Sequence, residues 1–430
     1  MDIAGQDINS SAYMRIGIDD TDSPAGMCTT YLGALLAGRL SDSGMTVRET
    51  YLIRLNPNVI HKTRGNAAIC IDVIGDISMA FSMACDIVEE LADFSCEETN
   101  PGVVVSDRAL PAEFYKRAVT DFCEISEAVA LLEESEALFR GYKNGRGLIG
   151  AAAAVSSVLE DSTAEILVYR RPDCRGYPRM VDRKSLFLAD GETYPHTWDT
   201  VDRENNIVVC VPHTPDPVLF GIRGTSGEWV LRARRMVIAE APEREQIFTT
   251  NQGTDAHLIA GSPGALEPGR SYLVRGTVST TPMTRSGGHV SFYLSEGGFS
   301  VRCMAYEPTK GFRDIIRMLI AGDEVVVVGS YKGGSINLEK IGVMSIVSRI
   351  EQKAPFCSYC RKRMTSAGKG KGYKCRICGA REQDPERVYL ARELKPGWYE
   401  VAPSARRHLA KPLCRGHPDL ERYGIEDQEG

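Results

Sequence analysis

The sequence has no apolar run long enough to cross a lipid bilayer. A spanning helix needs about 20 predominantly apolar residues, and the nearest candidate, residues 148–159, is a short alanine-rich stretch that contains serines. The first 13 residues also lack the basic segment and the apolar segment of a secretory leader. We therefore expect a cytoplasmic protein with no membrane partner.

Positive charge is not in excess either. The 430 residues contain 51 Lys and Arg against 57 Asp and Glu, which gives a net charge of −6. A protein of this charge does not attract nucleic acid over its whole surface. Any contact with RNA or DNA must therefore come from a local basic patch.

A disulfide framework is not indicated. The count of 13 cysteines is odd, and nine of them stand singly, which is typical of reduced thiols in an intracellular protein. The other four form two C-x-x-C pairs separated by 14 residues: Cys357, Cys360, Cys375 and Cys378. Four thiolates complete a closed tetrahedral shell around Zn²⁺, so this spacing predicts a structural zinc ribbon with no open catalytic position.

The chain around these cysteines is basic. Residues 352–380 contain eight Lys and Arg and no acid, and such patches bind phosphate backbones. We expect nucleic-acid contacts from Arg361, Lys362, Arg363, Lys369, Lys371 and Lys374. Arg406, Arg407, His408 and Lys411 add positive charge further along. A merely solvated basic loop is the alternative.

Hydrophobic periodicity predicts an α+β multidomain chain, and the length suggests about three domains. After an extension at residues 1–13, strands and helices alternate through residues 14–160 in the manner of an α/β domain. Residues 161–265 contain strands with only weak helix periodicity, which favours a small α+β unit.

Short strands follow. Five of them lie within residues 270–350, with a helix at 311–320 between the third and the fourth, and this is the connectivity of an OB-fold barrel. An unrelated small barrel is the alternative. Residues 352–430 hold the zinc ribbon and a basic C-terminal region.

Three carboxylates crowd into the turn after the first strand. Asp19, Asp20 and Asp22 precede a helix whose start carries the hydroxyls of Thr29 and Thr30. Mg²⁺ prefers such oxygen ligands and bridges to substrate phosphates, and a helix N-terminus favours a phosphate group. The alternative is a loop of solvated aspartates.

Two further turns have the composition of phosphate-binding segments. Lys62, Arg64 and Asn66 lie just before a strand, and residues 143–147 open a helix with Lys143, Asn144, Gly145, Arg146 and Gly147. Neither matches the P-loop pattern, so each alone is weak evidence. Together with the aspartates they are typical of a nucleoside-triphosphate site outside the familiar folds.

The order of these motifs resembles one family. Gly17–Ser23 and Gly26–Thr30 are similar to the start of the archaeal tRNA-isoleucine 2-agmatinylcytidine synthetases. The likeness continues through residues 54–58, 62–66, 100–103, 143–150, 212–215, 221–224 and 250–255, and covers residues 14 to about 380.

The resemblance implies an ATP-dependent ligase. It would conjugate agmatine to the position-2 carbon of the wobble cytidine in the isoleucine tRNA with the anticodon CAU, giving AMP and two phosphates. The modified tRNA then decodes AUA. The implied domains are a kinase-like domain, a ferredoxin-like domain, an OB-fold and a zinc ribbon, and the implied cofactors are ATP, Mg²⁺ and Zn²⁺.

The resemblance also implies residue roles. Thr29 would be a phosphorylated catalytic residue, with the three aspartates binding Mg²⁺ and assisting proton removal. The basic turns would bind ATP phosphates, and the six basic ribbon residues would bind tRNA. Agmatine is expected at His213, Phe220, Gly221, Ile222, Arg223 and Gly224. No obligate protein partner is indicated.

Two alternatives remain. A non-catalytic nucleic-acid-binding protein would use the barrel and the ribbon but leave the aspartates and Thr29 without a role. A small-molecule kinase with added RNA-binding modules would release ADP without needing tRNA. Among the barrel aromatics, Phe292 and Tyr293 are neighbours on a strand, so they point to opposite faces and at most one can lie in the core.

Overall fold

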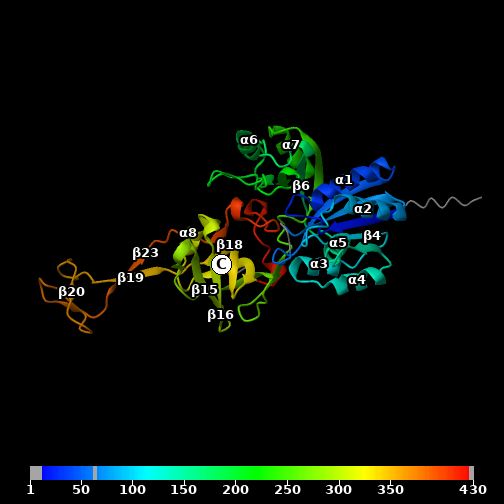
Figure 1. The fold of residues 1–430 in the computed structure, drawn as a ribbon. Coiled ribbons are helices and arrows are strands. Elements are labelled where there is room, and N and C mark those ends of the chain that lie inside the picture. The colour runs from blue at the N-terminus through cyan, green and yellow to red at the C-terminus, as the bar shows by residue number, and fades with distance from the viewer. Residues whose placement is uncertain (1–11, 62–64, 426–430) are drawn as a thin grey trace, which may run out of the picture.

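The structure, a computed structural model, describes residues 12–61 and 65–425 (Figure 1). Within these residues, no helix combines the length and the apolar character that crossing a membrane requires. Two sheets form the framework, one with nine strands and one built around a barrel.

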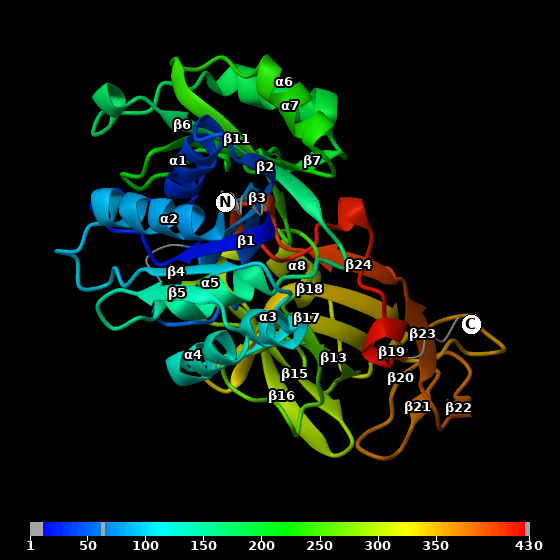
Figure 2. The ribbon, with the colours of Figure 1, turned by 90° about the vertical axis from the view of Figure 1, so that its right-hand side faces the viewer.

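The N-terminal region, residues 12–155, is a three-layer α/β arrangement. Its elements are β1 (Ala12–Asp19), α1 (Thr29–Asp42), β2 (Thr46–Arg54), β3 (Ala67–Gly75), α2 (Ile77–Leu91), β4 (Gly102–Ser106), α3 (Ala112–Thr120), α4 (Ile125–Glu134), β5 (Leu138–Gly141) and α5 (Gly147–Val155). In Figure 2, α1 and α2 are drawn above β1 and β4, and α3 and α4 are drawn below these strands. The mixture of strands and helices expected for residues 14–160 is present, and α3 and α4 are two separate helices.

Small residues bring α5 into backbone contact with the sheet. A Cβ atom on Gly17 would lie 2.3 Å from the carbonyl oxygen of Ala151, and one on Gly102 would lie 2.2 Å from the backbone carbonyl carbon of Gly147. Because α5 is apolar all round and its alanines are buried, it packs as a core helix. This close approach places the start of α5 beside the end of β1.

The second region continues the same sheet. Its elements are β6 (Thr163–Arg170), α6 (Arg183–Thr193), β7 (Thr197–Trp198), β8 (Val201–Asp202), β9 (Ile207–Val208), β10 (Val218–Gly224), α7 (Gly227–Met236) and β11 (Pro242–Thr250). The strand order β5-β4-β1-β3-β2-β11-β6-β10-β7 joins both regions through a parallel β2–β11 pair. Two regular helices, α6 and α7, form here although the sequence of this region shows only weak helix periodicity.

The barrel closes through five strands. Its sheet contains β12 (Leu258–Ala260), β13 (Ser271–Val278), β14 (Met283–Thr284), β15 (Val290–Glu296), β16 (Phe299–Ala305), β17 (Glu324–Lys332) and β18 (Ser335–Ser345). Strand β13 pairs with both β17 and β15, and this closes a barrel of the five strands β13, β17, β18, β16 and β15. Helix α8 (Phe312–Arg317) lies between β16 and β17, as predicted. Phe292 is buried in the barrel core and Tyr293 is exposed.

A small module then projects from the barrel (Figure 1). Paired strands β19 (Arg349–Lys353) and β23 (Glu386–Leu390) form its stalk, and β20 (Thr365–Ser366), β21 (Tyr373–Lys374) and β22 (Arg381–Glu382) form its tip. The chain returns through β24 (Gly397–Glu400), which pairs with β18 of the barrel.

Arginines after β24 form ion pairs with other parts of the chain instead of extending the basic surface of the ribbon. Arg406 is buried between Asp199 of the second region and Glu400, whose Oε1 lies 2.7 Å from its Nη2. Arg415 pairs with Asp161 at 2.8 Å. Arg406 was expected to add positive charge beyond the ribbon, but it adds none to the surface. Its charge is neutralised inside the protein because burial requires paired partners.

Candidate active site

The aspartates lie at the end of β1, the third strand in the order of the nine-stranded sheet. Asp19 is packed under Gly150 of α5, and Asp20 adopts a left-handed backbone with φ of 59°. Burial raises the pKa of Asp19 well above its usual range. Burial also raises the pKa of Asp20 to about 7, although the Arg146 guanidinium opposes this shift. Burial and mutual repulsion disfavour the charged form of these carboxyl groups, so a bound cation would stabilise them.

Thr29 is held at the start of α1 by Asp22. Its Oγ1 donates to Asp22 Oδ1 at 2.9 Å, and its backbone N–H donates to the same oxygen at 2.5 Å. The Thr21 hydroxyl donates to Thr29 Oγ1 at 3.0 Å. The arrangement places a buried hydroxyl, a carboxylate able to accept its proton and a helix N-terminus at one point.

Arg146 links the turn at residues 143–147 to the aspartates at the end of β1. Its Nε donates to Asp20 Oδ2 at 2.9 Å, and its Nη2 donates to the Glu98 carbonyl at 2.6 Å. The backbone N–H of Arg146 donates to Asn144 Oδ1 at 2.9 Å. Gly145 has φ of 77° and Lys143 φ of 55°, so residues 143–147 form a tight left-handed turn before α5.

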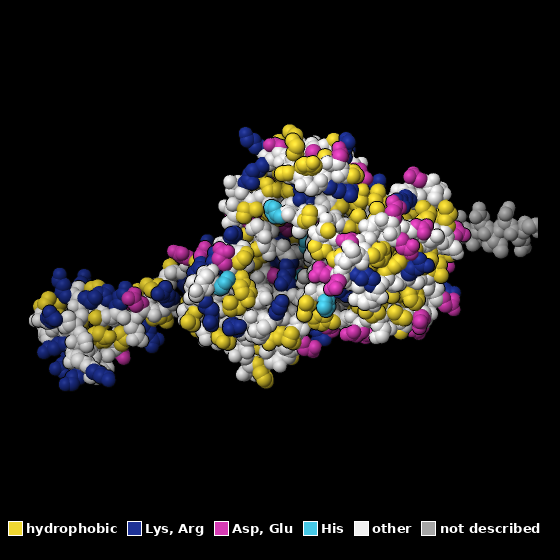
Figure 3. Space-filling view, viewed as in Figure 1, with side chains coloured by type: hydrophobic (Ala, Val, Ile, Leu, Met, Phe, Trp, Pro, Cys, Tyr) yellow, Lys and Arg dark blue, Asp and Glu magenta, His cyan; other side chains and the backbone are white. Residues whose placement is uncertain are grey.

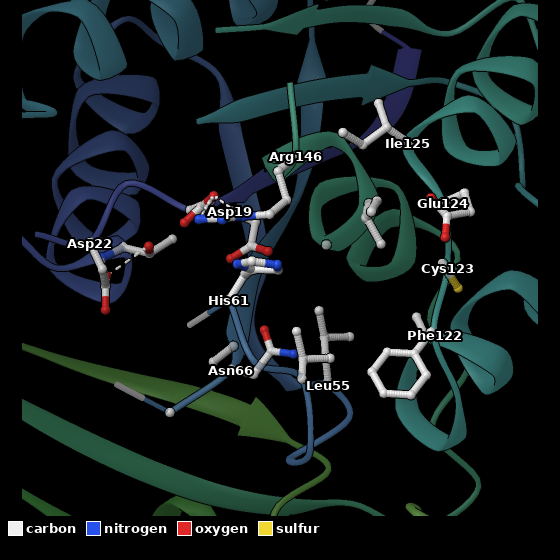
Figure 4. Close-up of a pocket in the computed structure, with 18 of the residues that line it drawn as sticks. Asp19, Asp22, Leu55, His61, Asn66, Phe122, Cys123, Glu124, Ile125 and Arg146 are labelled. Atoms are coloured by element: carbon white, nitrogen blue, oxygen red, sulfur yellow. Dashed lines mark hydrogen bonds and ion pairs between the residues drawn. The ribbon is translucent and has the colours of Figure 1, made fainter. Parts of the chain in front are cut away.

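All four predicted catalytic residues line one cavity of about 400 Å³ (Figure 4). Asp19, Asp20, Asp22, Thr29 and Arg146 line one end, together with Asn66 and the unpredicted His61. Lys62 and Arg64 lie outside the described residues. Lys143, Asn144, Gly145 and Gly147 shape the turn that carries Arg146 but do not line the cavity.

The opposite end of this cavity is mostly apolar, although Asp121 and Glu124 also line it, and it was not predicted. It is lined by Leu55, Val59, Ala118, Phe122, Ile125 and Ile149. Residues 121–124 connect α3 to α4, and Phe122, Cys123 and Glu124 lie across the cavity from Asp19 and Asp22 (Figure 4). The only sequence feature that could have indicated this wall is the interruption of the helical pattern at Asp121–Glu124. An apolar wall opposite a charged end suits a flat base joined to phosphates.

A second cavity of about 280 Å³ adjoins the first, and Thr29 and Asp22 line both. Its far wall comes from the second region, where Gly221 and Arg223 of β10 face Glu165 of β6. Arg223 Nε lies 3.3 Å from Glu165 Oε1, and the Gln252 amide donates to Glu165 Oε2 at 2.5 Å. Asp216 and Cys210 complete this wall, and burial raises the pKa of the Cys210 thiol to about 12.

The other predicted agmatine residues lie elsewhere. Phe220 and Ile222 are buried in the core beneath α6 and α7, because alternate residues of β10 face opposite sides of the sheet. Gly224 packs against the His196 carbonyl, and His213 does not line the cavity although its neighbours Pro212 and Thr214 do.

Arg54 closes the second cavity from β2. Its Nη2 lies 3.9 Å from Glu165 Oε2, and its Nε donates to the Gln252 side chain at 3.2 Å. Burial lowers the pKa of Arg54 to about 10, against the stabilising charge of Glu165. Glu165 thus pairs with both Arg54 and Arg223, so this cavity wall carries one carboxylate and two guanidinium groups.

The four predicted zinc ligands come together at the tip of the projecting module. The Sγ atoms of Cys357, Cys360, Cys375 and Cys378 all lie within 4.8 Å of one another. Backbone N–H groups of Cys378 and Ile377 lower the pKa of the Cys375 thiol to about 6, which favours the thiolate that binds metal. The donor set therefore fits a structural Zn²⁺ ion.

The predicted basic residues are all exposed on this module. Figure 3 shows Lys and Arg gathered on its surface. Arg361, Lys362, Arg363, Lys369, Lys371 and Lys374 are exposed. Arg363 also pairs with Glu386 at 3.2 Å and lies over the Phe356 ring. The module carries its charge away from the acidic body of the protein.

Known proteins match this chain along nearly its full length. Family models match as the TiaS TCKD domain at residues 15–144, the TiaS FLD domain at 145–257 and the TiaS C-terminal zinc ribbon domain at 354–394. A relative from Methanocorpusculum labreanum, the isoleucine-tRNA 2-agmatinylcytidine synthetase TiaS, is 49% identical over 95% of this chain and 98% of its own. The protein of the same name from Methanosarcina mazei is 47% identical, covering 94% and 97%.

Solved structures agree. The crystal structure of TiaS in complex with its isoleucine tRNA and ATP matches with a TM-score of 0.88 and 43% identity over 95% of this chain and 98% of that one. The complex of TiaS with the same tRNA, AMPCPP and agmatine matches with a TM-score of 0.85 and 41% identity over the same shares, 95% and 98%. The chain belongs to the TiaS family of isoleucine-tRNA 2-agmatinylcytidine synthetases.

Proposed function

We propose that the protein is an ATP-dependent ligase that joins agmatine to the position-2 carbon of the wobble cytidine of the CAU-anticodon isoleucine tRNA. The observation that carries this function is the position of Thr29, whose side chain lines both adjoining cavities. One cavity suits a nucleoside triphosphate and the other suits a small cation. A phosphorylatable hydroxyl between them can link ATP consumption to amine transfer.

The larger cavity is the proposed ATP site. Its apolar end would hold the adenine, and its acidic end would hold the phosphates through Mg²⁺ bound by Asp19, Asp20 and Asp22. The bound Mg²⁺ would neutralise phosphate charge as a Lewis acid. Arg146 and Asn66 would contact phosphate oxygens, assisted by Lys62, Arg64 and the turn of Lys143, Asn144, Gly145 and Gly147.

The hydrogen bonds of Thr29 support its role as the phosphoryl acceptor. Asp22 accepts the Thr29 hydroxyl proton at 2.9 Å and can take it as the oxygen attacks phosphorus. The N-terminus of α1 and Arg146 stabilise the charge that develops on the transferred group. The carbonyl oxygen at position 2 of cytosine is a poor leaving group, so it too must be phosphorylated before an amine can displace it.

The smaller cavity is the proposed agmatine site. Glu165 and Asp216 offer carboxylates to a ligand with a guanidinium and an ammonium group, with Gly221 leaving room beside Glu165. A Cβ at Gly221 would lie 3.0 Å from Glu165 Oε1. Arg223 would orient that carboxylate, and Phe220, Ile222 and Gly224 would hold β10 in place.

The remaining domains are proposed to bind tRNA. The wobble base must leave its stack to reach Thr29, and exposed aromatics such as Tyr293 and Tyr306 on the barrel can stack unpaired bases. The six basic ribbon residues would contact phosphates. We assign residues 14–160 to a kinase-like domain, 161–265 to a ferredoxin-like agmatine-binding domain, 270–350 to an OB-fold and 352–430 to the ribbon and C-terminal region. Because its substrate is a tRNA, we place the protein in the cytoplasm.

Product analysis tests this function. The protein is incubated with Mg²⁺, labelled ATP, agmatine and the CAU-anticodon tRNA, and each component is omitted in turn. We expect repeated turnover of ATP to AMP only when tRNA and agmatine are both present, because phosphorylation of Thr29 and of the tRNA without agmatine stops after a single turnover. Repeated release of ADP without tRNA would favour a small-molecule kinase, and no nucleotide turnover with the correct tRNA would favour a non-catalytic binding protein.

A further inference from the structure

The chain downstream of the zinc ribbon returns to the active site. The Gly253 N–H donates to the His408 carbonyl at 2.8 Å, and the Asp255 N–H donates to the Leu409 carbonyl at 2.8 Å. The Lys411 N–H donates to Asp255 Oδ1 at 2.7 Å. These bonds lay residues 408–411 along the loop after β11, so the backbone of His408 is fixed between the barrel and the nine-stranded sheet.

This placement brings the His408 imidazole into the smaller cavity. His408 lines that cavity together with Thr29, Glu165 and Gly221. Its Nε2 lies beside Gly65, where an added Cβ would be 3.4 Å from Nε2 and 2.5 Å from Arg54 Nη1. The imidazole therefore lies where the two cavities adjoin, because Gly65 lines both.

Agmatine needs a base at this point. A primary alkylammonium has an ordinary pKa near that of lysine, about 10.4, so it is protonated at neutral pH and cannot attack carbon. A general base works best when its own pKa lies near the operating pH. Histidine, with an ordinary pKa of about 6.5, meets this condition.

The carboxylates of the cavity are assigned to other roles, since Glu165 and Asp216 would bind the cationic groups of agmatine and Asp22 would take the Thr29 proton. Asp22 holds the hydroxyl and the N–H of Thr29. Glu165 is shared by Arg54, Arg223 and Gln252. Asp216 accepts the Val218 N–H at 2.9 Å and lies 3.4 Å from the Arg179 guanidinium.

We propose that His408 is the base that activates agmatine, an inference that rests on the proposed function. The ammonium gives one proton to the imidazole, and the freed lone pair forms the bond from nitrogen to the position-2 carbon. The bond from that carbon to the phosphorylated oxygen breaks, and its electron pair leaves with the phosphate. The phosphate takes the second proton from the nitrogen, and the imidazolium returns the first to solvent.

The test uses the full-length protein with His408→Asn, which keeps a polar side chain of similar size but removes the base. His417→Asn is the matched control, because His417 lies on the same segment, stacks on Trp398 and does not line this cavity. Three quantities are measured for each protein: phosphate labelling of Thr29 without agmatine, phosphorylation of the tRNA, and kcat and KM for agmatine.

We expect His408→Asn to lower kcat for agmatine by about 100-fold, the lower range for loss of a general base. Labelling of Thr29 should be unchanged, phosphorylated tRNA should accumulate, and the control should behave as wild type. Unchanged kcat, a change in KM alone, or an equal loss of Thr29 labelling would each overturn the assignment. If the wild-type protein forms no agmatine product, the proposed function itself fails.

Discussion

Replacing Gly150 with alanine tests whether Asp19 takes part in phosphoryl transfer. Gly150 lies in α5 and faces the end of β1. A Cβ atom there would be 1.8 Å from Asp19 Oδ2 and 2.5 Å from its Cγ. Carbon and oxygen atoms in contact are normally about 3.5 Å apart, so either the carboxylate or the helix must move by more than about 1 Å.

The helix has little room to move. The backbone of α5 already touches β1 and β4 at Gly17 and Gly102, so the carboxylate must turn away. A misplacement of about 1 Å in a catalytic group costs about 100-fold in rate, equivalent to about 2.7 kcal/mol. Overpacking of this kind destabilises a protein by about 1–3 kcal/mol.

The assay is the rate of phosphate labelling of Thr29 at saturating ATP and Mg²⁺, with thermal unfolding followed in parallel. Gly38→Ala in α1 is the control, since the nearest atom to its added Cβ is the tip of Arg244 at 3.5 Å. We expect Gly150→Ala to remain folded and to label Thr29 about 100-fold more slowly. A folded Gly150→Ala protein that labels at the wild-type rate would refute the role given to Asp19.

Four other measurements each test a single contact or group. Thr29→Val should abolish phosphate labelling of the protein, and unchanged labelling would count against Thr29 as the acceptor. Cys357→Ser should weaken tRNA binding, measured by filter retention, more than ATP binding, because it opens the zinc shell far from the cavities; equal losses would contradict this. Burial raises the pKa of Asp20 from 3.8 to about 7. The folded state therefore keeps a proton that the unfolded state has lost between those values, and metal-free wild type should lose stability across this range as pH rises. In urea titrations Asp20→Asn should show a shallower decline, and identical slopes would be the contrary result. Lys340→Met should lower the free energy of unfolding by about 3–5 kcal/mol, because it leaves the Asp255 carboxylate buried without its ammonium partner. Adding Asp255→Leu should recover part of that loss, and no recovery would show that the buried charge is not its cause.

Local patterns were sufficient to predict several features of this protein. The C-x-x-C spacing requires no knowledge of the fold, because each pair points its thiolates at one ion. The strands of the barrel were found from alternating apolar residues, and Phe292 and Tyr293 divided between core and surface as alternation requires. The aspartates followed a recognisable strand and preceded a recognisable helix.

Long-range pairing could not be read in this way. The two N-terminal regions share one sheet through only two residue pairs, Thr249 with Tyr51 and Thr250 with Leu52. Apolar alternation shows which face of a strand is buried but not which strand lies next to it. The smaller cavity depends on that pairing, because it brings Arg54 beside Glu165.

Charge was also misleading without the fold. Arg406 follows a basic ribbon in sequence, yet it is buried against Asp199 and Glu400. A buried arginine and an exposed one look alike in a sequence, since their difference lies in partners that are distant along the chain. The same is true of His408, which reaches the cavity only because the chain returns from the ribbon.

Nucleoside mass spectrometry tests the central claim most directly. The CAU-anticodon tRNA is incubated with the protein, Mg²⁺, ATP and agmatine, then digested and compared with tRNA treated without agmatine. The account predicts that the wobble cytidine gains the mass of agmatine less one water, and that Thr29→Val protein produces no such nucleoside. An unmodified wobble cytidine after complete incubation with wild-type protein would contradict it.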